Sequence, residues 1–226
     1  MEQDNTQTKT TKKSTARYVF FGFLVVGLIA LIISVCMANV NVSVDVTMRR
    51  YVIGSGTEIT SKDNADEGKS GLTSVKVNLI RDLDSAKDND KVVKGIEEAD
   101  SKASIALVLY IMAVLLGAGL VAINAIQIFC GKNNKGLTAG KIVCFSLLLA
   151  ATIFAVFMYF GTIHNLEYAL EHALSAKTGD IEIISTAHVG SSLAIVFGVI
   201  SIVVTIVGFI VTSVTNRNLH RQTANN

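Results

Sequence analysis

The feature that most constrains this chain is a set of four long blocks without Asp, Glu, Lys or Arg. The blocks cover residues 18–38, 103–131, 142–163 and 189–216. Each is at least as long as the roughly 20 residues that a helix needs to cross a hydrocarbon core of about 30 Å. In lipid, a helix satisfies the hydrogen-bonding groups of its own backbone. The blocks lack the two-residue alternation of a membrane barrel. The sequence therefore predicts four transmembrane helices, at 17–38, 103–130, 142–163 and 189–214.

The distribution of Lys and Arg predicts the orientation of these helices. Bases outnumber acids in the N-terminal tail (1–16, with Arg17 at its end), in the short connection 131–141, and in the C-terminal tail (215–226). The connection 164–188 is acidic, and long loops such as 39–102 cross largely regardless of charge. We therefore expect a multi-pass protein of the cell membrane with both termini cytoplasmic and the segments 39–102 and 164–188 outside. We expect the 1–16 tail to be disordered.

Two further points follow from charge. The net charge of +2 averages over two environments, so it gives no reason to expect nucleic acid as a partner. The first apolar block has a basic flank, which leaves a cleaved signal sequence as an alternative. Its apolar core is longer than the usual signal core, and this favours a retained helix.

The segment that follows the first block alternates in a strand-like way. Val40, Val42, Val44, Val46 and Met48 share one parity, and polar residues occupy the other. This pattern predicts a strand at about 40–53 with its Val/Met face inward. We expect a mobile polar loop at 57–71, a second strand at 72–80 and a helix at 88–102.

The second outer segment is predicted to contain the continuation of helix 142–163 outward to about 178, and then a short strand at 181–184. The predicted fold is thus a mainly α membrane protein: a four-transmembrane-helix bundle with a small extracytoplasmic β-sheet formed by the two outer loops. The chain has no proline to kink its helices.

The sequence offers few candidates for a redox or metal site. The three cysteines include no CxxC and no pair in the outer loops, so we expect no disulfide and no thiol redox site. His164 and Glu167 could hold a divalent metal on one helix face, but a solvated acidic helix face explains the same residues. We therefore predict no metal, cofactor or small-molecule substrate.

Two sets of residues are candidates for helix contacts. Asn124 and Gln127 lie at i, i+3 in the second span, where they either hydrogen-bond between helices or line a pore in an oligomer. Gly190, Ala194 and Gly198 form a small-residue stripe in the fourth span. It serves either packing within the bundle or self-association.

The layout resembles the claudin-like four-transmembrane (tetraspan) membrane proteins. The resemblance rests on a strand leaving the first span, a large first outer loop ending in a helix, an outward-extended third helix and a short strand before the fourth. The family's Trp-Gly-Leu-Trp element is absent, since the chain has no Trp. The paired cysteines of the first outer loop are absent too. The resemblance is therefore one of topology, and it implies no tight-junction activity.

No nucleophile–base spacing, HExxH motif or phosphate loop occurs, so we do not expect an enzyme. The sequence favours an assembly, scaffold or adhesion component that acts through its outer domain, with the lipid bilayer and either further copies or another membrane protein as partners. The alternative is a subunit of a transporter, secretion machine or oligomeric channel.

Overall fold

A computed structural model describes residues 2–51, 58–83, 89–130, 135–178 and 181–224. Four long helices dominate it: α1 (Glu2–Met37), α4 (Asp90–Phe129), α5 (Lys135–Leu174) and α6 (Ser192–Ala224). Each contains a stretch long and apolar enough to cross a membrane. The prediction of four apolar helices is thus confirmed, and the chain is consistent with a tetraspan topology.

The described residues form two compact units. Unit 1 comprises residues 1–34, 109–153 and 196–226, and unit 2 comprises residues 35–108 and 154–195. Both α4 and α5 contain 40 residues, which gives each a length of about 60 Å. That is about twice the thickness of a hydrocarbon core. Each of these helices contributes residues to both units.

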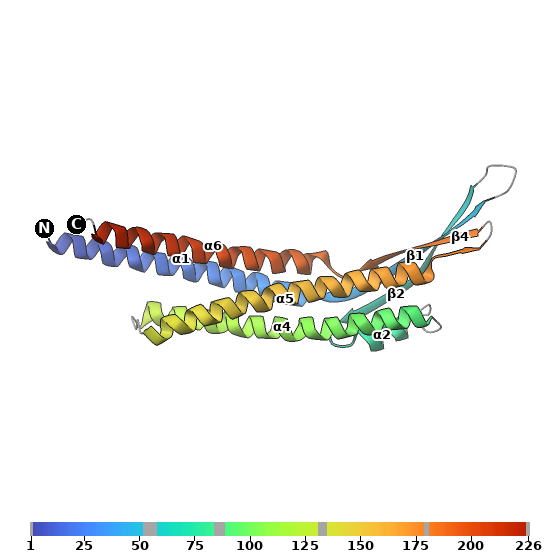
Figure 1. The fold of residues 1–226 in the computed structure, drawn as a ribbon, viewed down its shortest axis with the longest axis horizontal. Helices are drawn as coiled ribbons and strands as arrows, with labels where there is room; N and C mark the ends of the chain where they lie inside the picture. The colour runs from blue at the N-terminus through green and yellow to red at the C-terminus, as the bar shows by residue number, and fades with distance from the viewer. Residues whose placement is uncertain (1, 52–57, 84–88, 131–134, 179–180, 225–226) are drawn as a thin grey trace. The chain divides into compact units, whose positions relative to one another are not determined.

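Unit 1 is a bundle of α1, α4, α5 and α6. Small residues allow close contacts inside it: a side chain on Gly27 would meet Thr205, and one on Gly208 would meet Phe23. The Ser201 hydroxyl donates to the Gly27 carbonyl oxygen at 2.8 Å, which joins α6 to α1. The start of α1 and the end of α6 lie at the same end of this unit (Figure 1).

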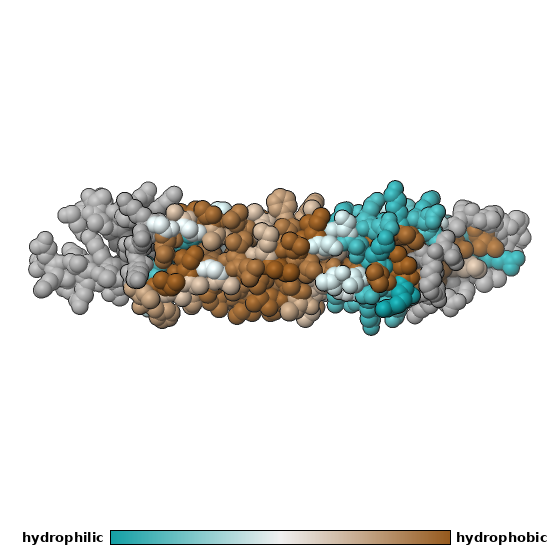
Figure 2. Space-filling view, turned by 90° about the horizontal axis from the view of Figure 1, so that it is seen from below, coloured by the Kyte–Doolittle hydropathy of each residue, from teal (hydrophilic) through white to brown (hydrophobic). Residues whose placement is uncertain are grey.

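The outer surface of unit 1 is apolar. Large hydrophobic side chains such as Val26, Leu115, Leu147 and Val203 are more than half exposed. Figure 2 shows this surface as a broad brown zone with little interruption. A surface of this kind is rare on soluble proteins, whereas it is typical of helices that face lipid.

Unit 2 contains one antiparallel sheet. Its strands are β1 (Asn39–Tyr51), β2 (Glu58–Gly71), β3 (Ala176–Thr178) and β4 (Ile181–Val189), in the order β2-β1-β4-β3. β1 pairs with β2 along its whole length and with β4 from Val42 to Arg50 (Figure 1). The sheet therefore joins the two segments that the sequence predicts to be outer loops.

One face of the sheet packs on helices. Val40, Val42 and Val44 are at most 2% exposed, as the alternation in this segment predicts. α2 (Val75–Asp82) contacts β2, and α5 contacts β4 through hydrogen bonds from Ser185. The core beneath the sheet is completed by apolar residues from α2, α4, α5 and the segments beside α2: Leu72, Val75, Leu79, Leu83, Val92, Ile96, Ala99, Leu166 and Leu170.

Two predictions for the first large segment are wrong. Residues 72–80 are not a strand, because the structure has α2 at Val75–Asp82. Val75, Leu79 and Leu83 are fully buried while Val77 is 68% exposed, so burial follows a spacing of four rather than two. The predicted loop at 57–71 is largely strand β2, whose backbone pairs with β1 although few of its side chains are apolar.

Several predicted helix ends also differ. α5 ends at Leu174 instead of about 178, because Ala176–Thr178 turn back as β3 beside β4. α5 begins at Lys135, so most of the predicted loop 131–141 is helical. Likewise α1 begins at Glu2 and α6 continues to Ala224, so the predicted tails are helical over those residues. No glycine or proline between residues 2 and 16 interrupts the first of these.

Candidate functional site

The most distinctive surface of unit 2 is the edge of the sheet formed by β2. One side of β2 pairs with β1 from Glu58 to Gly71. No other strand among the described residues pairs with its second side. Near one end this edge is covered, because the backbone N–H of Lys69 donates to the Asp82 carboxylate of α2. The remainder of β2 presents backbone donors and acceptors that a further strand can use.

Arg81 holds the Asp82 carboxylate that covers this end of the edge. The Arg81 Nε donates to the Asp82 Oδ1 at 2.9 Å. This hydrogen bond, followed by a smaller effect of the positive charge, lowers the pKa of Asp82 below its ordinary value of 3.8. Asp82 is therefore a carboxylate at neutral pH and accepts the Lys69 N–H as an anion.

The apolar face of the sheet loses its cover along β1. Burial decreases from Val44, which is 1% exposed, through the half-buried Val46 to Met48, which is 46% exposed. Met48 pairs with Ile183 of β4 and with Ser61 of β2, so these positions share one face. Ile181 lies on the same face and is 38% exposed. The prediction that Met48 faces inward is thus wrong, because the helices cover only the first half of the strand.

A polar cleft of about 550 Å³ lies elsewhere in unit 2. Its lining includes Ser43, Glu67, Lys69, Glu167 and His188. The Glu167 Oε1 accepts the Val189 N–H at 3.3 Å, so this carboxylate helps to attach β4 to α5.

His164 and Glu167, the possible metal pair in the sequence, have no third candidate ligand among the residues that the structure describes. The ring of His164 is parallel to that of Phe160 at 6.2 Å. Within the described part of the chain, no cluster of three or more His, Cys, Asp or Glu side chains fits a metal ion.

Asn124 and Gln127 lie inside the bundle of unit 1. They are 3% and 7% exposed. The Asn124 amide donates to the Leu120 carbonyl oxygen at 2.7 Å, and its Oδ1 accepts a hydrogen bond of 2.5 Å from the Lys141 Nζ. The amide thus joins α4 to α5, as expected if Asn124 forms a hydrogen bond between helices.

The three small residues at the start of the fourth span do not form one helical stripe. Gly190 precedes α6 and has φ +76°, which is the left-handed region. Ala194 and Gly198 are buried within the chain. Ala194 and Gly198 therefore pack against other residues of the same chain.

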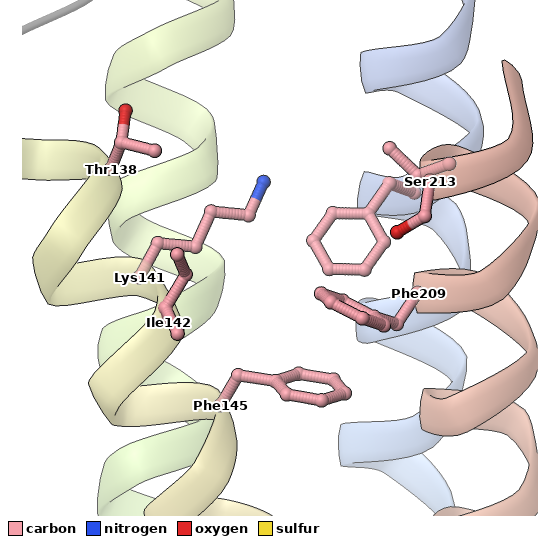
Figure 3. Close-up of a pocket in the computed structure, with 8 residues that line it drawn as sticks. Thr138, Lys141, Ile142, Phe145, Phe209 and Ser213 are labelled. Atoms are coloured by element: carbon pink, nitrogen blue, oxygen red, sulfur yellow. The ribbon is translucent and has the colours of Figure 1, made fainter. Parts of the chain in front are cut away.

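Sequence reasoning missed Lys141, which it placed in a loop. The Lys141 Nζ lies 4.2 Å from the centre of the Phe20 ring, beside its bond to Asn124. A cavity of about 210 Å³ adjoins it, lined by residues of α1, α5 and α6 (Figure 3). The available signal was the absence of any helix breaker other than glycine between Lys135 and the apolar block that begins at Ile142.

Comparison with known proteins adds no relative. No protein-family model matches the chain, and no curated protein matches it. The four apolar helices are consistent with a tetraspan topology, and no family match supports the finer resemblance to claudin-like proteins.

Proposed function

We propose that this chain is a non-enzymatic multi-pass membrane protein that acts as an assembly or adhesion component by pairing its sheet with that of a second copy. The single observation that carries the proposal is the β2 edge of unit 2, which has no strand partner among the described residues. Exposed strand edges are the usual route by which one sheet extends into another. An exposed apolar face adjoins this edge, because Met48 pairs with Ser61 of β2, and it offers side chains that a second copy can bury.

The charge pattern of β2 supports a second copy as the occupant. Lys62 is its one base between Glu58 and Glu67, and it stands among acids at Asp63, Asp66 and Glu67. In an antiparallel pair of two β2 strands, Lys62 of each copy can lie opposite an acid of the other. Such opposite-charge pairs favour one register, whereas like charges directly opposite each other are unfavourable.

We propose that the chain spans the cell membrane, with its sheet outside the cell and both termini in the cytoplasm. This orientation is supported by the excess of Lys and Arg in the terminal segments and the 131–141 connection. In this arrangement neighbouring molecules in one membrane present their β2 edges side by side.

The alternative of a pore or transporter subunit has less support. That reading places Asn124 and Gln127 on a shared lumen. Both side chains are buried within one chain, and Asn124 has partners on its own helix and on α5.

The experiment places a charge on the exposed apolar face. The variant Met48→Lys should abolish or strongly weaken association of the full chain in a mild detergent or in nanodiscs, measured by light scattering coupled to sizing. Thr186→Lys is the matched control. It adds the same charge to an exposed position on the opposite face, across from Asp45, and should associate like the wild type.

Two outcomes contradict the proposal. One is a wild-type chain that stays monomeric at every concentration in lipid. The other is an assembly that Met48→Lys leaves unchanged, which assigns the interface to another surface.

A further inference from the structure

The cavity beside Lys141 combines one cation with apolar walls. Lys141 reaches into it from α5, Phe145 lies on the same helix, and Phe209 and Ser213 come from α6 on the facing side (Figure 3). Phe145 and Phe209 stack with ring centres 4.6 Å apart, so the apolar floor is built by two helices. The cavity thus has a charged end at Lys141 and an apolar end at the two phenylalanines.

Among the side chains that the structure describes, no carboxylate is paired with the charge of Lys141. Its contacts are the neutral Asn124 amide and the face of Phe20. The acids of unit 1 are Glu2 and Asp4, and neither is among the side chains that the structure describes. Arg17 adds a second positive charge near enough to act on Lys141. Two cations without a described carboxylate favour an anion between or beside them.

The position along the helix indicates the kind of anion. Lys141 immediately precedes the uncharged block 142–163, so it marks the boundary between polar chain and apolar span. At this depth in a bilayer, basic side chains meet lipid headgroups while apolar side chains meet acyl chains. An ammonium group has three N–H donors, and Asn124 accepts one of them.

We infer that this cavity binds an anionic phospholipid, with the lipid phosphate at the Lys141 ammonium and an acyl chain against Phe145 and Phe209. The inference rests on the membrane location that the four apolar helices indicate and is independent of the sheet pairing proposed above. Ser213 places a hydroxyl at the same cavity, where it can donate to a phosphate oxygen. The lipid would contact both α5 and α6, which supply most of the residues that line the cavity.

The test uses the full chain purified in detergent and exchanged into nanodiscs that contain phosphatidylglycerol and phosphatidylcholine in equal amounts. Native mass spectrometry of the protein released from the discs counts the lipids that remain bound. Wild type should retain phosphatidylglycerol at least about fivefold over phosphatidylcholine. Lys141→Gln should remove that preference and Lys141→Arg should keep it. Lys102→Gln, which changes a half-buried helical lysine beside Gly161 in unit 2, should not alter it.

A second variant guards against misfolding of Lys141→Gln. Ser213→Asp retains Lys141 but adds a carboxylate at the cavity, and it should also lose the preference for phosphatidylglycerol. The inference is overturned if wild type retains both lipids equally, or if both variants keep the preference. It is also overturned if millimolar inorganic phosphate displaces the bound lipid, because the site then recognises a free anion.

Discussion

The Tyr159 hydroxyl donates a hydrogen bond of 2.7 Å to the backbone carbonyl oxygen of Asn39. The same oxygen of Tyr159 accepts the Ser191 N–H at 3.1 Å. Asn39 is the first residue of β1 and is separated from the end of α1 only by Ala38, and Ser191 directly precedes α6. One buried phenol on α5 therefore satisfies backbone groups at two helix–strand junctions. This arrangement explains how the chain passes from the apolar helix α1 into a strand without a loop.

Removing that hydroxyl should destabilise unit 2. Tyr159→Phe leaves a backbone donor and a backbone acceptor without their partner, at an expected cost of about 1–3 kcal/mol. The thermal midpoint in a fixed detergent should decrease, and amide exchange at Ser191 should accelerate. Tyr168→Phe on the same helix is the control, because Tyr168 is 58% exposed. Equal effects of the two substitutions would remove the special role of Tyr159.

Gly190 should tolerate no side chain. Its φ of +76° costs other residues about 1–2 kcal/mol, and a Cβ there would lie 2.6 Å from the Ile163 Cδ1. Gly190→Ala should therefore lower the thermal midpoint and weaken the bond from the Gly190 N–H to the Asn41 carbonyl oxygen. Gly119→Ala, where a Cβ meets nothing within 4 Å, should be neutral or slightly stabilising. Unchanged stability of Gly190→Ala would show that this junction is not constrained as described.

A charge on the buried face of β1 should unfold the sheet. Val44 is 1% exposed, so Val44→Asp buries a carboxylate at a cost of about 3–5 kcal/mol. Limited proteolysis should then cleave unit 2 while the helices of unit 1 remain protected. Asn41→Asp is the matched control, because Asn41 is exposed and lies opposite Lys69. A protease-resistant Val44→Asp chain would contradict the placement of this face.

The Arg81–Asp82 pair gives a pH dependence whose sign is fixed. The pKa of Asp82 is lower in the folded chain than its ordinary value of 3.8, mainly because Arg81 donates to it. Its contribution to folding is therefore present above pH 3.8 and is lost as the pH falls through the lower folded value. An NMR titration of the Asp82 carboxyl carbon should give a midpoint below 3.8. Arg81→Gln should raise this midpoint and Arg50→Gln should leave it unchanged. A midpoint at or above 3.8 in the wild type would contradict the assignment.

Tyr159 of unit 2 and Lys141 of unit 1 show where sequence reasoning reaches its limit. The bond from Tyr159 to Asn39 joins residues 120 positions apart, and no local pattern reports such a contact. Lys141 precedes an apolar block. In the sequence, β1, β2, α2 and α4 all lie between it and Phe20, the phenylalanine that it contacts. Only the packing of α1, α4 and α5 reveals that its charge meets Phe20 and Asn124.

The sequence by itself determined the four apolar helices and the inward valines of β1. Both are properties of short windows, since hydrophobic length and alternation are set by neighbouring residues. Tertiary structure alone decided that the polar residues 58–71 form a strand and that Val75–Asp82 form a helix. An edge strand obtains its backbone hydrogen bonds from β1 whatever its side chains are, and α2 forms because Val75, Leu79 and Leu83 find a core under the sheet. These choices depend on partners far away in the chain, so no window of the sequence contains them.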